Sequence, residues 1–212
     1  MRLTLVIYAM SPGGAERVLS IIANYFAEKS WEISLITLDD GSTLPFYELH
    51  PSIVHQPLAV AGVSNRFFHG LKNNFKRIRA LRRAIKKNKP QLVMSVMDKT
   101  NILVLISTLG LGLPVIVCER STPSQYEIGP IWNFLRRLMY RRVSSLAVLT
   151  QNAVSYFPPG IRKHIHVIPN PVILPPPNTE KKRRQAEPSK KTVVAMGRLS
   201  EVKGFDLLIR AY

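Results

Sequence analysis

The sequence predicts an α/β fold in which a parallel sheet has helices on both faces. Strand and helix patterns alternate almost from the first residue, and short, nearly continuous apolar runs such as residues 3–9 are typical of strands buried on both faces. Parallel strands need crossover connections, which helices usually supply. Hydrophobic residues make up 46% of the 212 residues and charged residues 20%, a composition that excludes wholesale disorder.

Each predicted element rests on a local pattern. Short apolar runs between turn signals predict strands at residues 3–9, 32–38, 53–58, 92–97, 114–118, 145–149 and 164–168. Apolar residues at helical spacing predict helices at residues 15–29, 67–88, 101–111, 131–142 and 153–157. The proline-proline-glycine sequence at 158–160 is expected to end the last helix.

The pattern changes after residue 168, which we take as the end of an N-terminal domain of residues 1–168. Residues 169–190 contain five prolines by Pro177 and then a basic polar run, which is typical of a linker. Residues 191–196 are expected to form a strand, 197–200 a turn, and 203–212 the start of a helix. One strand and one helix cannot bury their own apolar faces, so residues 191–212 are interpreted as the start of a second, truncated domain.

Three observations exclude other classes of protein. The single cysteine, Cys118, cannot form an intrachain disulfide, which disfavours a cystine-framed secreted module and is compatible with a reducing cytoplasm. No apolar run approaches the roughly 20 residues of a membrane-spanning helix. Met1 and Arg2 are followed by a mostly apolar stretch at residues 3–10, but this stretch is short and lacks a small-residue cleavage site, so a strand is favoured over a signal peptide.

The positive charge is concentrated in patches. The chain has 30 Lys and Arg against 13 Asp and Glu, a formal charge of +17. Ten basic residues lie between Arg66 and Lys89, and ten more form two further groups, so that 20 of the 30 lie in three patches: Arg136, Arg137, Arg141 and Arg142, and then Lys181, Lys182, Arg183, Arg184, Lys190 and Lys191. Such patches indicate an anionic partner, which is a nucleic acid, an acidic lipid or a phosphorylated substrate.

The predicted helix at 67–88 has a cationic stripe beside an apolar arc. At about 100° per residue, five cations share one side of the helix: Lys72, Lys76, Arg79, Arg83 and Lys86. The adjoining arc is apolar: Phe68, Leu71, Phe75, Ile78, Leu81 and Ile85. No acidic residue occurs between positions 49 and 97 to offset the repulsion, so an anion is the expected partner. A basic but inert surface helix is the alternative, and a polynucleotide groove is disfavoured because no stacking aromatics line the stripe.

Two adjacent glycines, Gly13 and Gly14, lie between the first predicted strand and helix. Without a Cβ atom they let a ligand or a facing backbone approach closely. The following helix offers free N–H groups and the positive end of its dipole, which suits a phosphate or an oxyanion. The alternative is a tight turn without a ligand.

Several sequence strings together resemble the retaining glycosyltransferases of family 4. They are GGAER at 13–17, SVMDKTN at 95–101, VCERSTP at 117–123, AVLTQN at 147–152, HVIPNPV at 166–172 and MGRLSEVKG at 196–204. The resemblance covers essentially the whole chain in the right order. It implies a Rossmann-like N-terminal domain that binds the acceptor, as in GT-B enzymes, followed by the beginning of the domain that binds the donor.

The resemblance also implies site residues in the cleft. Gly13 and Gly14 are expected near the donor phosphate and the acceptor, and Asp98, Glu119 and Arg120 at strand ends facing the cleft. Arg120 stands where a common family pattern has a donor-contacting histidine, so its sugar contact is in doubt. A salt bridge is as good an interpretation for Glu119 or Arg120, and helix capping is the alternative for Asp98.

Two cations near the end of the chain complete the implied site. Arg198 and Lys203 resemble the pair that neutralises the donor diphosphate, whose leaving group gains charge when the sugar–phosphate bond breaks. No metal or other cofactor is expected, and four of the histidines show no metal-ligand spacing: His55, His69, His164 and His166.

The favoured function is therefore transfer of a sugar, with retention, from a nucleotide-diphosphate sugar to a glycan acceptor. The resemblance implies a polyprenyl-diphosphate-linked acceptor at the cytoplasmic face of the membrane, with Lys72, Lys76, Arg79, Arg83 and Lys86 engaging its diphosphate and the anionic membrane surface. A second hypothesis is a non-catalytic binding module, either truncated or half of a split enzyme whose donor-binding domain is a separate chain. A nucleic-acid-binding protein is the weaker third.

Overall fold

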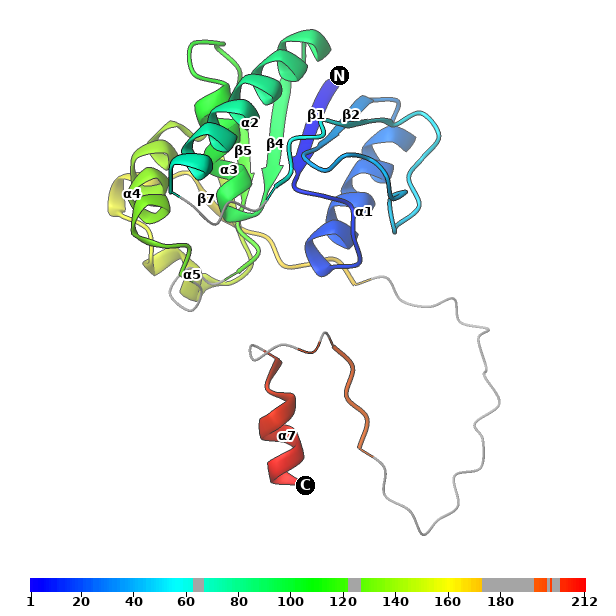
Figure 1. The fold of residues 1–212 in the computed structure, drawn as a ribbon, viewed down its shortest axis with the longest axis vertical. Coiled ribbons are helices and arrows are strands. Elements are labelled where there is room, and N and C mark those ends of the chain that lie inside the picture. The colour runs from blue at the N-terminus through cyan, green and yellow to red at the C-terminus, as the bar shows by residue number, and fades with distance from the viewer. Residues whose placement is uncertain (63–66, 122–126, 173–192, 198, 200–202) are drawn as a thin grey trace. The chain divides into compact units, whose positions relative to one another are not determined.

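The computed structural model describes residues 1–62, 67–121, 127–172, 193–197, 199 and 203–212. Seven parallel strands form one sheet in the order β3-β2-β1-β4-β5-β6-β7 (Figure 1). The strands are β1 (Arg2–Ile7), β2 (Glu32–Thr37), β3 (Val54–Pro57), β4 (Leu92–Val96), β5 (Val115–Cys118), β6 (Ser145–Val148) and β7 (Ile165–Val167). All seven lie where the apolar runs predict them, and the predicted α/β fold is confirmed.

The helices follow the strands as expected, with differences at their ends. They are α1 (Gly14–Glu28), α2 (Phe67–Asn88), α3 (Asp98–Ser107), α4 (Pro130–Met139), the 3-10 helix η1 (Tyr140–Arg142), α5 (Gln151–Ser155) and α6 (Pro159–Arg162). Helix α3 begins three residues before the predicted start, and α5 begins two residues before it. The short α6 was not predicted. Pro159 is its first residue, a position where the missing proline N–H leaves no helical hydrogen bond unmade.

Alternating residues of the strands send their side chains to two separate cores. Leu3 and Leu5 of β1 belong to a cluster with Leu19 and Ala23 of α1. Val6 belongs to a second cluster, which also contains buried residues of α2, α3, η1 and α5: Leu81, Ile85, Ile102, Tyr140 and Ala153. Because both faces of the central strands are covered, these strands need the near-continuous apolar runs seen in the sequence.

The order of the strands in the sheet reverses at β1: β2 and β3 follow on one side of this strand, and β4 to β7 follow on its other side. This strand pairs with β2 on one side, Val6 facing Ile36, and with β4 on the other, Val6 facing Ser95. The connections that follow β1 and β4 therefore diverge, and they leave an opening at the carboxyl ends of these two strands. Ligands of open parallel sheets bind at such a reversal, which in this domain lies between the turn before α1 and the start of α3.

The chain divides into two compact units, Met1–Pro171 and Val172–Tyr212. In the second unit, α7 (Phe205–Ala211) contains no buried residue. The strand predicted at 191–196 is wrong for its described part, because residues 193–196 form no strand. A strand forms only when a neighbour pairs with its backbone groups, and the described part of this unit offers none.

Candidate functional site

Hydrogen bonds to the Gly13 carbonyl hold the turn between β1 and α1 in place. The Gly13 carbonyl accepts hydrogen bonds from the Arg17 N–H and from the Tyr47 hydroxyl, both at 3.0 Å. Gly13 has an extended backbone and Gly14 begins the helix. A Cβ atom added to Gly14 would meet no atom within 4 Å, so the space beside this residue is open to a ligand.

The amino-terminal end of α1 has a carboxylate close by. A Cβ atom on Gly13 would collide with the carboxylate of Glu16, which therefore lies against the turn. Glu16 is in the first turn of α1, where the helix dipole favours negative charge. An anionic ligand at this helix end must displace Glu16, a flexible side chain. The open space predicted at the paired glycines is present at Gly14, whereas Gly13 is covered.

The junction between β4 and α3 contains a strained residue. Met97 has φ 80° and ψ 139°, a conformation rare for a residue with a Cβ atom. Its N–H donates to the Cys118 carbonyl at 3.2 Å, and its own carbonyl accepts the Asn101 N–H at 2.8 Å. These bonds tie β4, β5 and α3 together at the sheet edge where β4 ends.

Asp98 is the first residue of α3 and is only 7% exposed. Its carboxylate accepts the Lys99 N–H at 2.6 Å. Asp98 thus lies at the predicted strand end. Its carboxylate also satisfies a free N–H group in the first turn of the helix, which agrees with helix capping, the alternative role of this residue.

Glu119 follows β5 and points into the protein interior. Its side chain is almost fully buried, and its Oε1 atom accepts the Tyr140 hydroxyl at 2.5 Å and lies 3.8 Å from Nη1 of Arg136. The Oε2 atom is buried without a hydrogen-bond partner among the described residues. Glu119 therefore forms a salt bridge with Arg136, which was the alternative to a role in the cleft.

Burial raises the pKa of Glu119 to about 7. The hydrogen bond from Tyr140 and the charge of Arg136 act in the opposite direction, and the nearby Asp98 adds to the rise. The network continues from Tyr140 to the Asn101 side-chain amide at 3.2 Å, and from Asn101 to the Ser95 hydroxyl at 2.7 Å. A buried carboxyl group whose pKa its surroundings raise thus lies directly after the end of β5.

Arg120 connects the end of β5 to the segment that follows β7. Its Nη1 atom donates to Oδ1 of Asn170 at 2.7 Å. Its Nε atom is buried and has no hydrogen-bond partner among the described residues. Partial burial lowers the pKa of the guanidinium from its usual value, although the group stays charged. An oxygen of a ligand at this sheet edge would satisfy the remaining donors.

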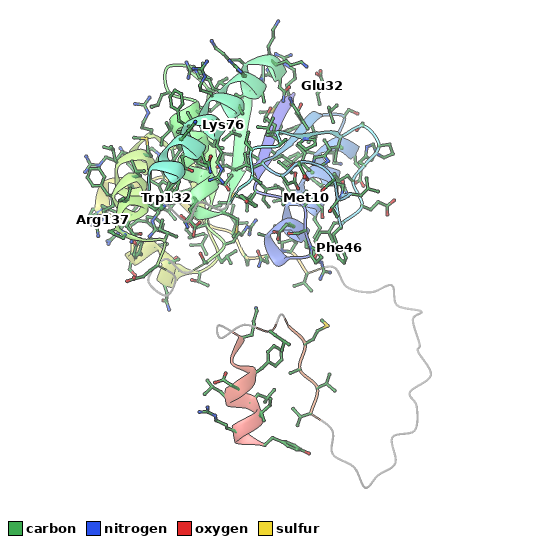
Figure 2. The ribbon with its side chains drawn as sticks, in the orientation of Figure 1. Met10, Glu32, Phe46, Lys76, Trp132 and Arg137 are labelled. Carbon is green, nitrogen blue, oxygen red and sulfur yellow. The ribbon has the colours of Figure 1, made fainter. Side chains whose placement is uncertain are left out.

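The cationic stripe of α2 lies in solvent. All five of its members are exposed: Lys72, Lys76, Arg79, Arg83 and Lys86. Figure 2 labels Lys76 among them. The guanidinium of Arg79 lies 5.7 Å from the centre of the Phe75 ring, which is 60% exposed.

The rest of α2 is anchored. Leu81 and Ile85 of the predicted apolar arc are fully buried, while the side chains of Phe68 and Leu71 lie outside the described residues. Arg82, which is not in the stripe, donates to the carbonyls of Ser107 and Leu109. Because α2 connects two parallel strands, it runs antiparallel to them, and its first turns lie at the carboxyl edge of the sheet (Figure 1).

The predicted donor-phosphate pair, Arg198 and Lys203, belongs to the second unit. Arg198 lies outside the described residues, and Lys203 is an exposed residue of the second unit. Across the described part of the chain, no group of three or more His, Cys, Asp or Glu side chains could hold a metal ion. No described helix is both long and apolar enough to cross a membrane.

Sequence reasoning did not identify Glu16, Tyr47 or the two partners of Glu119. A signal for Arg136 existed, because it lies four residues after Trp132 and four before Tyr140, on the core-facing side of the same helical run. A charged residue at a core position predicts a buried partner of opposite charge. No pattern in the sequence indicated that this partner would be Glu119.

The seven-stranded parallel sheet with helices on both faces defines a Rossmann-like domain. A sequence model of the family described as Glycosyltransferase Family 4 matches residues 12–174. The chain belongs to this family, as the resemblance of its motifs indicated.

A relative of known activity comes from Campylobacter jejuni subsp. jejuni serotype O:2. It is the "GalNAc-alpha-(1->4)-GalNAc-alpha-(1->3)-diNAcBac-PP-undecaprenol alpha-1,4-N-acetyl-D-galactosaminyltransferase", 32% identical over 171 residues. The match covers 81% of this chain and 46% of the relative. The chain therefore spans about half the length of the curated relative that it matches.

Solved structures share the fold at low sequence identity. Sucrose-phosphate synthase of Thermosynechococcus elongatus is 11% identical with a TM-score of 0.63, over 79% of this chain and 47% of that one. The lipopolysaccharide outer core galactosyltransferase WaaB is 16% identical with a TM-score of 0.57, over 85% and 50%. HepE of Anabaena, bound to UDP and glucose, is 15% identical with a TM-score of 0.58, over 80% and 44%. These likenesses support the fold alone.

Proposed function

We propose that this chain is the N-terminal, acceptor-binding part of a retaining glycosyltransferase. The complete enzyme transfers a sugar from a nucleotide-diphosphate sugar to a polyprenyl-diphosphate-linked glycan at the cytoplasmic face of the membrane. Family membership supports the reaction class. The name of the Campylobacter relative, which contains a PP-undecaprenol-linked glycan, supports the acceptor class.

The observation that carries the acceptor proposal is the cationic stripe of α2. Five exposed cations follow one side of a helix whose first turns lie at the carboxyl edge of the sheet. Lys72 and Lys76 belong to the half of the helix nearer that edge, and Arg79 follows about one turn after Lys76. A diphosphate offers several anionic oxygens, and it can meet cations that lie one helical turn apart. The acceptor's diphosphate on this stripe would leave its glycan free to extend towards the opening beside Gly14.

Exposed apolar side chains beside these cations support a membrane surface as the second partner. Phe75 lies next to the stripe, and three residues of α4 face solvent: Ile131, Phe134 and Leu138. Arg137 and Arg141 lie on the same exposed side of α4 and η1. Aromatic and aliphatic side chains among cations are the composition of a helix that rests at an anionic lipid interface.

The remaining roles follow from position. Gly14 and Arg120 lie at the carboxyl edge, where Gly14 has open space beside it, and Asp98 is the first residue of α3, two residues after the end of β4. We assign them to the acceptor side of the cleft. Arg198 and Lys203 are assigned to the donor diphosphate through the resemblance of their motif, and a metal ion takes no part in the proposed reaction.

The test compares two acceptors with the complete enzyme that includes the donor-binding half. One acceptor is a glycan on a polyprenyl diphosphate and the other is the same glycan without lipid and diphosphate, each assayed with a panel of nucleotide sugars. Replacing Lys72, Lys76 and Arg79 by Gln should raise KM for the diphosphate-linked acceptor at least about tenfold, since each loses a charge-assisted contact. KM for the free glycan should stay unchanged. An equal effect on both acceptors, or no transfer from any donor, would contradict the proposal.

A non-catalytic binding module remains the second candidate, because the chain spans only 46% of its relative. It predicts that the 212-residue chain binds the diphosphate-linked acceptor and shows no transferase turnover by itself. A truncated module stays inactive when a donor-binding chain is added, whereas half of a split enzyme regains turnover. We expect turnover to return when the donor-binding half is supplied. Transfer by the 212-residue chain alone would exclude a binding module.

A further inference from the structure

A second basic hollow lies away from the carboxyl edge of β1 and β4. It has a volume of about 280 Å³ and lies between the end of α4 and the short helices α5 and α6. Its lining includes three arginines and two hydroxyl groups: Arg136, Arg137, Arg162, Ser155 and Tyr156. None of the cleft residues lines it, so this pocket is separate from the proposed acceptor site.

Two of the three guanidinium groups are fixed by the protein. Arg162 donates through Nε to the Phe157 carbonyl at 2.8 Å and through Nη2 to the Ser155 carbonyl at 3.0 Å, which leaves Nη1 outside these bonds. Arg136 donates to the Tyr156 hydroxyl and lies 4.9 Å from the centre of that ring. Groups held in this way lose little freedom when a ligand binds.

The third arginine of the pocket, Arg137, is not fixed by the protein. It is exposed on the outer side of α4 (Figure 2), and no hydrogen bond or ion pair holds it within the described part of the chain. Its guanidinium can therefore turn towards a ligand in the pocket.

The charges around the pocket do not cancel. No Asp or Glu lines it, and the carboxylate that compensates Arg136 belongs to Glu119, 3.8 Å away and buried in the core. Arg137 and Arg162 remain without an acidic partner in the described structure. Two uncompensated cations at a concave surface with an aromatic wall favour a bound anion, because the wall excludes water and strengthens the field.

We propose that this pocket binds a phosphate group. Guanidinium groups from α4 and α6 line it, and the Tyr156 hydroxyl adds a further donor, whereas the Ser155 hydroxyl already donates to the Asn152 carbonyl at 2.8 Å. A phosphate monoester has three terminal oxygens and can accept hydrogen bonds from donors in several directions. A carboxylate has two oxygens in one plane, which a single guanidinium group can bind side by side. The phosphate belongs either to a soluble phosphorylated compound or to the headgroup of an anionic lipid.

Inorganic phosphate is the probe, titrated into the 212-residue chain by calorimetry. Arg137→Gln is the main variant because this side chain has no partner to lose, and Arg141→Gln in η1 is the matched control, because it removes an exposed charge of the same segment outside the pocket. We expect Arg137→Gln to weaken phosphate binding about tenfold, the loss of one charge-assisted contact, and Arg141→Gln to leave it unchanged. Arg162→Gln should act like Arg137→Gln, and its melting temperature shows whether it folds.

The cationic stripe of α2 also attracts anions, so each titration is repeated with Lys72, Lys76 and Arg79 replaced by Gln. The pocket predicts that the effect of Arg137→Gln persists in this background. Phosphate binding that is absent at millimolar concentration, or that is equally strong in the Arg137→Gln and Arg141→Gln variants, would overturn the proposal.

Vesicles distinguish the two sources of phosphate. If the ligand is a lipid headgroup, Arg137→Gln lowers binding to phosphatidylcholine vesicles that contain phosphatidic acid more than Arg141→Gln does. If the ligand is soluble, the two variants bind these vesicles alike and differ only with inorganic phosphate.

Discussion

Met97 shows how a single residue can be held in an unfavourable conformation at the edge of the sheet. Its positive φ of 80° is combined with a ψ of 139°, and the hydrogen bonds to Cys118 and Asn101 keep it there. Residues in such rare backbone regions persist only where their surroundings enforce them, and they cluster at functional sites. Met97 lies between β4 and Asp98, so its strained backbone sets the direction in which α3 leaves the sheet.

Met97→Gly should stabilise the domain by about 1 kcal/mol, because glycine adopts this conformation without strain. Lys89→Gly is the matched comparison. Lys89 has a φ of 46°, near the ordinary left-handed region, and the gain there should be smaller. Urea denaturation of the three proteins measures both effects. A Met97→Gly protein that is less stable than the wild type would show that the Met97 side chain contributes more than its backbone strain costs.

Glu119 should make the stability of the domain depend on pH. Below about pH 4.5, its usual pKa, the carboxyl is protonated in both states. Between this value and its folded pKa of about 7, the unfolded chain releases the proton while the folded domain keeps it, so rising pH favours unfolding. Above pH 7 the contribution is constant. Over this window the domain should lose about 3 kcal/mol from this group.

Glu119→Gln removes this titration. The difference in unfolding free energy between wild type and variant should therefore change between pH 4.5 and pH 7.5 and be flat beyond both limits. Comparing the two proteins cancels the contribution of other titrating groups such as His55, whose pKa burial lowers. Parallel pH profiles for the two proteins would show that Glu119 is ionised throughout.

At the scale of elements, α2 has two sides with different roles. Leu81 and Ile85 fix the helix to the sheet, and Arg82 binds the end of α3 through two carbonyls. The opposite side carries the five solvated cations of the stripe and the exposed Lys87. The sequence predicted a cationic stripe beside an apolar arc, and the structure confirms both where the side chains are described.

Changing Lys72, Lys76 and Arg79 to Glu should abolish most binding to anionic liposomes at low salt, because it reverses the charge at the acceptor end of the helix. The matched control changes Lys29, Arg142 and Lys163 to Glu, an equal change in net charge at exposed positions elsewhere. Co-sedimentation at two salt concentrations measures both. Equal losses in the two variants would assign binding to the net charge of +17 and not to α2.

At the scale of the whole molecule, the buried core belongs to the unit Met1–Pro171. Both apolar clusters lie within it, and α7 of the second unit buries no side chain. The described residues of the second unit therefore add little to the cooperative stability of the chain.

A chain ending at Pro171 should melt within about 2 °C of the 212-residue chain, because none of the described residues after Pro171 is buried. Calorimetry of both chains at equal salt tests this. A melting temperature lower by more than about 5 °C would show that residues after 171 pack on the domain in solution.

The sequence by itself determined the fold, the cationic stripe and the family. The strand positions could be predicted from apolar runs, because a strand that is covered on both faces needs apolar residues at successive positions. The stripe could be predicted from helical periodicity alone. These properties are local, so neighbouring residues suffice to encode them.

Only the tertiary structure decided what the candidate side chains contact. The sequence placed Glu119 and Arg120 at the same strand end, yet Glu119 turns inward to Tyr140 and Arg136 while Arg120 reaches Asn170. Adjacent strand residues point to opposite faces, and which partner waits on each face depends on helices distant in the sequence. The covering of Gly13 by Glu16 and the pocket beside Arg137 likewise depend on how packed elements place their side chains.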